Sequence, residues 1–138
     1  MKYMILSYAT QHDYDGMAGK DTDGPAWTPE QFAAMGEFMQ KFTTELAESG
    51  ELVETRGLAA PALTRRIGSR NGEVVVTDGP YAETQEVLAG YWVVECDSLD
   101  RATEIAARLN ETPAPEHVRA AAYADIRPLM EHQEELLT

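Results

Sequence analysis

The chain has 138 residues, and its 11 Lys and Arg against 24 Asp and Glu give a formal net charge of −13. Such acidity argues against nucleic acid or an anionic lipid surface as partner, since both bind through clustered basic side chains. The single Cys96 excludes an internal disulfide and a cysteine-based zinc site. With no signal-like or membrane-spanning run, we expect a cytoplasmic protein with one domain over residues 1–138.

The first part of the chain predicts a strand, a long loop and an amphipathic helix. Residues 2–8 are apolar on both faces, as in a covered central strand. Residues 9–27 are rich in Gly and Asp and predict a loop. Thr28, Pro29 and Gln31 form a helix start with a capping box. The apolar residues that follow recur every three or four positions: Phe32, Met35, Met39, Phe42 and Leu46.

The middle of the chain predicts strands joined by turns. Residues 52–58 form one probable strand pattern, and residues 88–96 form a more apolar one. Residues 63–67 and 73–77 predict a hairpin around residues 68–72, which contain an Asn-Gly turn pair. The predicted sheet therefore receives most of its strands from this region.

The last part predicts a second helix and a final strand. Asp97 or Ser98 caps the helix, which runs to Asn110. Residues 117–127 alternate between two faces and predict a strand. Residues 129–138 form an acidic tail that can adopt a short helix.

The order of these elements predicts the fold class. Two helices on one face of an antiparallel sheet is the ferredoxin-like α+β arrangement. Two helices leave the other face of the sheet bare, and pairing with a second sheet would cover it. We therefore expect a homodimer.

Five segments resemble the DGPF-motif branch of the YCII-related family. The most specific is Val76-Thr77-Asp78-Gly79-Pro80-Tyr81-Ala82-Glu83-Thr84-Gln85-Glu86, and the others are residues 2–6, 57–61, 90–92 and 125–129. Tyr81 replaces the usual Phe, and the loop of residues 9–27 is longer than is typical. The resemblance implies a ferredoxin-like subunit in a dimeric α+β barrel.

The same resemblance implies little about chemistry. Some members of the wider family resemble small lyases, including a dehydrochlorinase acting on a chlorinated aromatic diol. Members of the DGPF branch also occur beside, or fused to, sigma factors. The fold itself hosts isomerases, monooxygenases and binding modules, so it does not decide the function.

Asp78 and His117 are the candidate catalytic residues. Asp78 follows a strand in an Asp-Gly-Pro turn, where it could act as a general acid or base or could simply cap nearby backbone N–H groups. The resemblance implies an Asp that works with a His. His117 lies near the end of the predicted sheet, whereas His12 lies in the acidic loop and His132 in the tail.

Aromatic and charged residues form the candidate substrate contacts. Tyr123, Asp125 and Arg127, with Arg119, share one face of the predicted last strand. That face forms a polar pocket wall if it lies inside the barrel. If it does not, its Arg and Asp side chains form a ladder at the dimer interface or under solvent. The remaining candidates are Tyr8, Tyr81 and Tyr91.

Other features carry less chemistry. Four arginines between residues 56 and 70 could attract an anionic ligand or an acidic partner, or could lie on a solvated hairpin. The fragments at residues 13–16 and 21–24 lack the acids of a calcium loop, so we assign no metal. We also expect no cofactor.

Two functions remain open. The first is a cofactor-independent lyase or isomerase that acts on a small, aromatic or polyketide-like molecule by proton transfer. The second is a ligand-binding or regulatory module without catalysis, associated with a sigma factor. The sequence does not choose between them.

Overall fold

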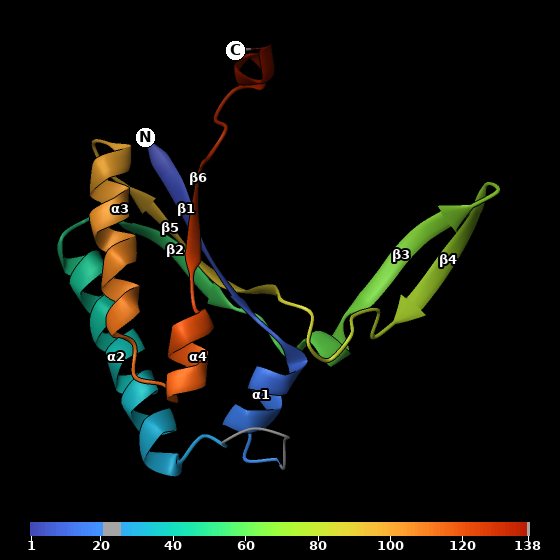
Figure 1. The fold of residues 1–138 in the computed structure, drawn as a ribbon. Helices are drawn as coiled ribbons and strands as arrows, with labels where there is room; N and C mark the ends of the chain where they lie inside the picture. Colours follow the sequence, from blue (N-terminus) through green and yellow to red (C-terminus); the bar gives the residue numbers. More distant parts are fainter. Residues whose placement is uncertain (21–25, 138) are drawn as a thin grey trace.

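A four-stranded antiparallel sheet forms the centre of the computed structural model, which describes residues 1–20 and 26–137. The strand order is β2 (Leu52–Gly57), β5 (Val87–Glu95), β1 (Lys2–Ala9) and β6 (Ala124–Pro128). Helices α2 (Pro29–Glu48) and α3 (Leu99–Ala107) lie on one face of this sheet (Figure 1). The arrangement is the predicted ferredoxin-like α+β fold.

The core lies between this sheet and the two helices. The rings of Phe42 on α2 and Trp92 on β5 form a T-shaped pair, with the ring centroids 5.6 Å apart. The rest of the buried cluster comes from β1, β5, α2, α3 and the residue directly after β5, and it comprises Tyr3, Ile5, Leu46, Val94, Cys96, Ala102 and Ile105. Burial of these side chains fixes α2 and α3 to the same face of the sheet.

The predicted helix starts are confirmed. The Thr28 hydroxyl accepts a hydrogen bond from the Gln31 amide, and the Gln31 side chain accepts one from the Thr28 amide. Ser98 caps α3 by accepting from the Arg101 amide. The helical path beyond α3 continues as a 3₁₀ turn, η2 (Arg108–Glu111), instead of one α-helix to residue 110.

The predicted hairpin is confirmed, and it forms a separate two-stranded sheet. Strands β3 (Arg65–Arg70) and β4 (Glu73–Asp78) follow the 3₁₀ turn η1 (Pro61–Leu63). Asn71 and Gly72 alone form the turn, with φ of 52° and 81°, so the loop is shorter than residues 68–72. We call this two-stranded projection the arm (Figure 1).

The prediction of an unbroken loop over residues 9–27 is wrong. Helix α1 (Gln11–Met17) forms within it, because Thr10 and Asp13 make a reciprocal capping box. The abundance of Gly and Asp concealed this start signal. Residues 21–25 lie outside the described residues.

The prediction of a strand over residues 117–127 is also wrong in its first half. Helix α4 (Glu116–Ala121) follows Pro115, and the strand β6 begins only at Ala124. The alanines in this segment satisfy a period of two, but alanine also has the highest helix propensity. Arg119 therefore lies on a helix and does not share a strand face with Asp125.

Two further features complete the description. The predicted short helix in the tail is a 3₁₀ helix, η3 (Gln133–Leu137). Within residues 1–20 and 26–137, no helix combines the length and the apolarity that a membrane crossing needs.

Thr28→Ala should lower the free energy of unfolding by about 1 kcal/mol, because it removes the hydroxyl of the α2 capping box. Urea unfolding followed by circular dichroism measures this change. Thr44→Ala makes the same chemical change on the exposed face of α2 and should leave stability unchanged or slightly higher. Equal losses in the two variants would contradict the capping role.

Candidate functional site

The structure contains a cavity of about 760 Å³ on the helix side of the sheet. Side chains from β1, β5, β6 and all four α-helices line it. Its apolar lining includes Met17, Trp27, Met35, Met39, Trp92, Leu109, Val118 and Ile126. Its polar lining includes Tyr8, Asp13, Thr103, Asn110, Thr112, Glu116, Arg119 and Tyr123. We call this space the helix-side cavity.

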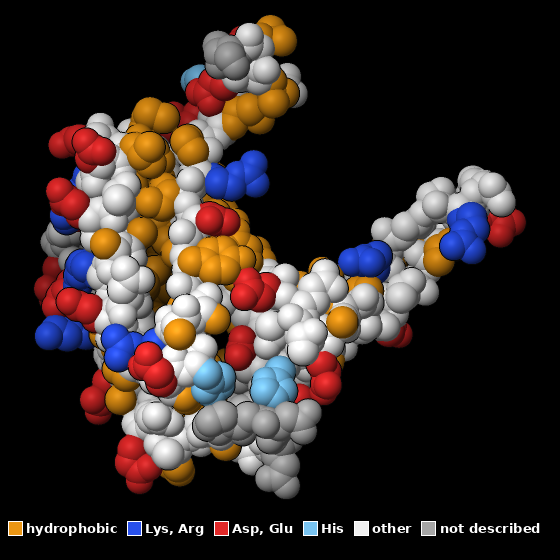
Figure 2. Space-filling view, in the orientation of Figure 1, with side chains coloured by type: hydrophobic (Ala, Val, Ile, Leu, Met, Phe, Trp, Pro, Cys, Tyr) orange, Lys and Arg blue, Asp and Glu red, His pale blue; other side chains and the backbone are white. Residues whose placement is uncertain are grey.

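The cavity lies where the sheet and its helices separate. Figure 2 shows hydrophobic side chains gathered in the furrow between α3 and β6. Helices α1 and α4 lie near the lower end of the sheet in Figure 1, and side chains of both line the cavity. Neither helix was predicted from the sequence, so the predicted elements gave no indication of the cavity.

Both tryptophans of the chain border the helix-side cavity. Trp27 and Trp92 are 9% and 7% exposed, and neither indole N–H has a hydrogen-bond partner among the described residues. A buried N–H without an acceptor is uncommon in folded proteins. The cavity wall therefore combines a large apolar surface with two indole N–H groups that have no acceptor among the described residues.

Helix α1 is held in place by contacts with segments far away in the sequence. Gly16 allows it to pack on Trp27, since a Cβ at this glycine would lie only 3.2 Å from a ring carbon. The Tyr14 hydroxyl donates to the Leu58 carbonyl at 2.8 Å. The His12 amide donates to the Glu83 carbonyl at 3.1 Å. Two of the motif segments thus position one wall of the cavity.

Two predicted contact residues, Tyr8 and Tyr123, meet at the edge of this cavity. Their rings stack with centroids 5.2 Å apart. The Tyr8 hydroxyl donates to Asp125 at 2.8 Å, and the Tyr123 hydroxyl donates to Glu86 at 2.6 Å. The hydrogen bond to Glu86 raises the pKa of Tyr123 to about 12, and the hydrogen bond to Asp125 raises the pKa of Tyr8. Both phenols are therefore protonated at neutral pH, and each O–H group is used in the hydrogen bond to its carboxylate.

We call the side of the sheet opposite α2 and α3 the open face. Three more of the predicted substrate-contact residues lie on it. Strand register places Tyr91 and Asp125 on either side of Leu6. Arg127 lies beside Met4 in the next row. These three predicted residues share a surface, but none of them lines the helix-side cavity.

Asp78 and Tyr81 lie at the base of the arm. The Asp78 carboxylate accepts two hydrogen bonds from the Arg65 guanidinium, at 2.7 and 3.3 Å. The guanidinium of Arg66 lies 5.3 Å from the centroid of the Tyr81 ring. Neither Asp78 nor Tyr81 lines the helix-side cavity.

The candidate histidines lie on separate elements. His117 is exposed on α4, between Glu116 and Val118, which both line the cavity. His12 lies on α1, and His132 is exposed in the tail. Within the described residues no hydrogen bond or ion pair joins Asp78 to His117, so their pairing stays a prediction.

Metal ligands do not converge in the described part of the chain. Its His, Cys, Asp and Glu side chains form no group of three that could hold an ion. Asp13 is used in the α1 capping box, and Asp15 lies 3.7 Å from the Lys20 ammonium. The fragment at residues 21–24 lies outside the described residues.

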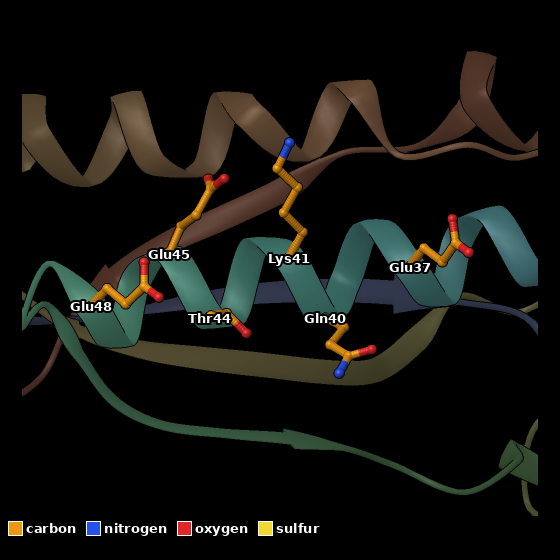
Figure 3. A pocket seen from close by; sticks show the side chains of 6 residues that line it. All are labelled: Glu37, Gln40, Lys41, Thr44, Glu45 and Glu48. Carbon is orange, nitrogen blue, oxygen red and sulfur yellow. The ribbon is translucent and has the colours of Figure 1, made fainter.

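A second hollow, of about 440 Å³, lies on α2 and carries no site. Figure 3 shows its six lining side chains, Glu37, Gln40, Lys41, Thr44, Glu45 and Glu48, all on this one helix. Glu45 there accepts a hydrogen bond from Arg108. All six lining side chains come from one helix, so no second element encloses a ligand there.

Comparison with known proteins places the chain in a family. An uncharacterized protein of Rhizobium meliloti (strain 1021) is 30% identical over 105 residues, which cover 75% of this chain and 80% of the relative. The family model described as the YCII-related domain matches residues 1–127. The chain therefore belongs to the YCII-related family.

Proposed function

We propose that this protein binds a small, uncharged or weakly acidic aromatic molecule in the helix-side cavity and acts on it by proton transfer. The reaction class is elimination or isomerisation without a cofactor. The cavity itself is the observation that carries the proposal.

The size and lining of the cavity suit such a ligand. Its volume of about 760 Å³ falls within the range of roughly 300–1,000 Å³ that is usual for small-molecule sites. Met35 and Met39 supply flexible, polarizable surface, and the two tryptophans supply flat aromatic surface. Arg119 is a single cationic side chain in the lining that could receive a hydroxyl or carboxylate group.

The proposed roles follow from the hydrogen bonds and the position of each group. Tyr8 and Tyr123 accept hydrogen bonds from the substrate through their phenol oxygens, since the O–H group of each already donates to a carboxylate. Asp78 and His117 remain the proposed acid and base, but Asp78 lies outside the cavity lining, so its role requires that a second subunit bring it to the bound substrate. Tyr81, Tyr91, Asp125 and Arg127 lie outside the cavity lining, so their proposed contacts belong to a pocket between two subunits.

Ligand binding should quench the intrinsic fluorescence, because Trp27 and Trp92 are the two tryptophans of the chain and both border the cavity. The probe is 4-nitroanisole, an uncharged nitroaromatic that quenches indoles, titrated into the protein and into its Trp27→Phe and Trp92→Phe variants. Both single-tryptophan variants should retain saturable quenching.

Ala120→Phe and Ala121→Phe form a matched pair for this titration. Both positions are exposed residues of α4, but only Ala120 lines the cavity. Ala120→Phe should weaken binding at least about 10-fold by filling ligand space, which corresponds to about 1.4 kcal/mol. Ala121→Phe should bind like the parent. Equal effects of the two variants, or no saturable quenching at all, would refute the site.

Asp78→Asn should lower turnover by at least about 100-fold, the usual scale for loss of a general acid or base. The substrate to use is the small molecule that native mass spectrometry detects on the protein as purified. The Arg65–Asp78 pair is exposed, so its loss should change stability by less than about 1 kcal/mol. Glu73→Gln, an acid-to-amide change on the same strand, is the control. Unchanged turnover in Asp78→Asn would exclude this mechanism.

The alternative is binding without catalysis, as a regulatory module with a sigma factor as partner. One observation favours it: the carboxylates of Asp13 and Asp78 are already engaged by a helix cap and by Arg65. In this case the copurified molecule returns unchanged from incubation with the protein, and Asp78→Asn binds it normally.

We also propose that the protein is a homodimer that joins two open faces. One row across this face reads Arg56, Tyr91, Leu6 and Asp125, and the next reads Glu54, Val93, Met4 and Arg127. The centre is apolar, and the charges at the ends have opposite signs. A two-fold axis between two such faces brings each Arg against an acid, whether it runs along or across the strands.

Arg127→Glu should raise the dimer dissociation constant at least about 10-fold, since it places like charges together at the interface. Arg127 has no ion pair among the described residues, so the change breaks no such contact within the subunit. Light scattering after size-exclusion chromatography separates 15.3 kDa from twice that mass. Lys41→Glu on the outer face of α2 is the matched charge change and should have no effect. A monomer in the parent protein would contradict the dimer.

A further inference from the structure

We propose that the arm docks on a second copy of this chain and clasps it. The inference rests on the proposed homodimer, but it concerns a different surface from the open face. The arm comprises β3 and β4, which among the described residues pair only with each other.

The arm presents unusual apolar surface for a projection. Register pairs Ile67 with Val76 and Ser69 with Val74, so Ile67, Val74 and Val76 share one side of the ribbon. These three side chains are between 54% and 73% exposed. Val75 points to the other side and is 39% exposed. Both sides of the ribbon therefore carry uncovered apolar groups.

A two-stranded ribbon with this much exposed apolar surface is unfavourable in an isolated subunit. An isolated two-stranded hairpin is marginally stable in water, and it gains stability when a third layer covers it. Three consecutive valines with free strand edges also invite pairing with other chains. A run that is apolar on both sides is typical of a strand that is covered on both sides. We infer that the valine run is covered in the assembled protein.

The position of the arm indicates what covers it. Figure 1 shows the arm projecting on the side of the sheet away from α2 and α3, which is the side of the open face. Figure 2 shows hydrophobic side chains bordering the hollow between the sheet and the arm. A second copy seated on the open face would occupy this hollow, within reach of the arm.

Charge complementarity favours a second copy as the occupant. Residues 65–78 hold three Arg against Glu73 and Asp78, which is 3 − 2 = +1, so the rest of the chain carries −13 − 1 = −14. Arg70, near the tip, has no ion pair within the described residues. A basic arm laid on the acidic body of another copy reduces the repulsion between two subunits of net charge −13.

A nitroxide on Val74→Cys tests this docking. The native Cys96 is buried, so the new thiol is the reactive one. The spin-label spectrum should change from mobile to immobilised as the protein concentration rises through the dimer dissociation constant. A label on Gln40→Cys, on the outer face of α2, should stay mobile at every concentration.

Sedimentation equilibrium of two unlabelled variants provides the second readout. Val74→Lys should raise the dimer dissociation constant at least about 10-fold, because it places a charge in the apolar contact. Val74→Ile keeps the apolar surface and should dimerise like the parent.

The outcomes separate this inference from the proposals above. A dimer whose arm label stays mobile, and which Val74→Lys does not weaken, overturns the arm contact and leaves the homodimer standing. A label that is immobile in the monomer shows that the arm packs on its own subunit and also overturns the inference. A protein that is monomeric at all concentrations refutes the homodimer and the arm contact together, while the quenching of Trp27 and Trp92 tests the cavity independently.

Discussion

The packing of two helices on a single face of a four-stranded sheet is the constraint on which the other features depend. Phe42 and Trp92 meet at the centre of that packing, and the fully buried Ile5, Val94 and Ile105 surround them. Apolar burial of this kind holds α2 and α3 firmly where they touch the sheet. The same arrangement leaves one face of the sheet without helices. It also leaves space at the end of the sheet that short elements must close.

The helix-side cavity follows from how that space is closed. Helices α1 and α4 are too short to fill it, with 7 and 6 residues respectively, so they form walls and not a second core. The α1 wall is held by segments far away in the sequence, as its hydrogen bonds with Leu58 and Glu83 show. Residues 57–61 and 76–86 therefore influence the candidate site through the backbone carbonyls that accept hydrogen bonds from α1. Asp78 itself lies at the base of the arm, where Arg65 holds its carboxylate.

Charge organises the two exposed surfaces of the protein. The open face carries acids and arginines at opposite ends of neighbouring rows, which makes the surface complementary to itself. The arm concentrates basic residues in a chain with a net charge of −13. A strongly acidic protein that self-associates needs such local arrangements, since its net charge opposes association. The proposed dimer and the proposed clasp both use the few arginines for this purpose.

The sequence alone was sufficient for the elements that local signals define. A capping box and helical spacing located α2, and a cap residue located α3. The Asn71-Gly72 pair located the arm, and the order of elements indicated the ferredoxin-like sheet. Prediction from the sequence was wrong for the alanine-rich α4, whose residues fit both the alternation of a strand and the propensity of a helix. It also missed α1, because the capping residue Thr10 precedes a stretch rich in Gly and Asp that is typical of turns. Tertiary structure alone brought Tyr8 to Asp125, 117 residues away, and separated Asp78 from the cavity. Local patterns determine how a segment folds, whereas the neighbours of a side chain depend on the register of strands that meet only in the folded sheet.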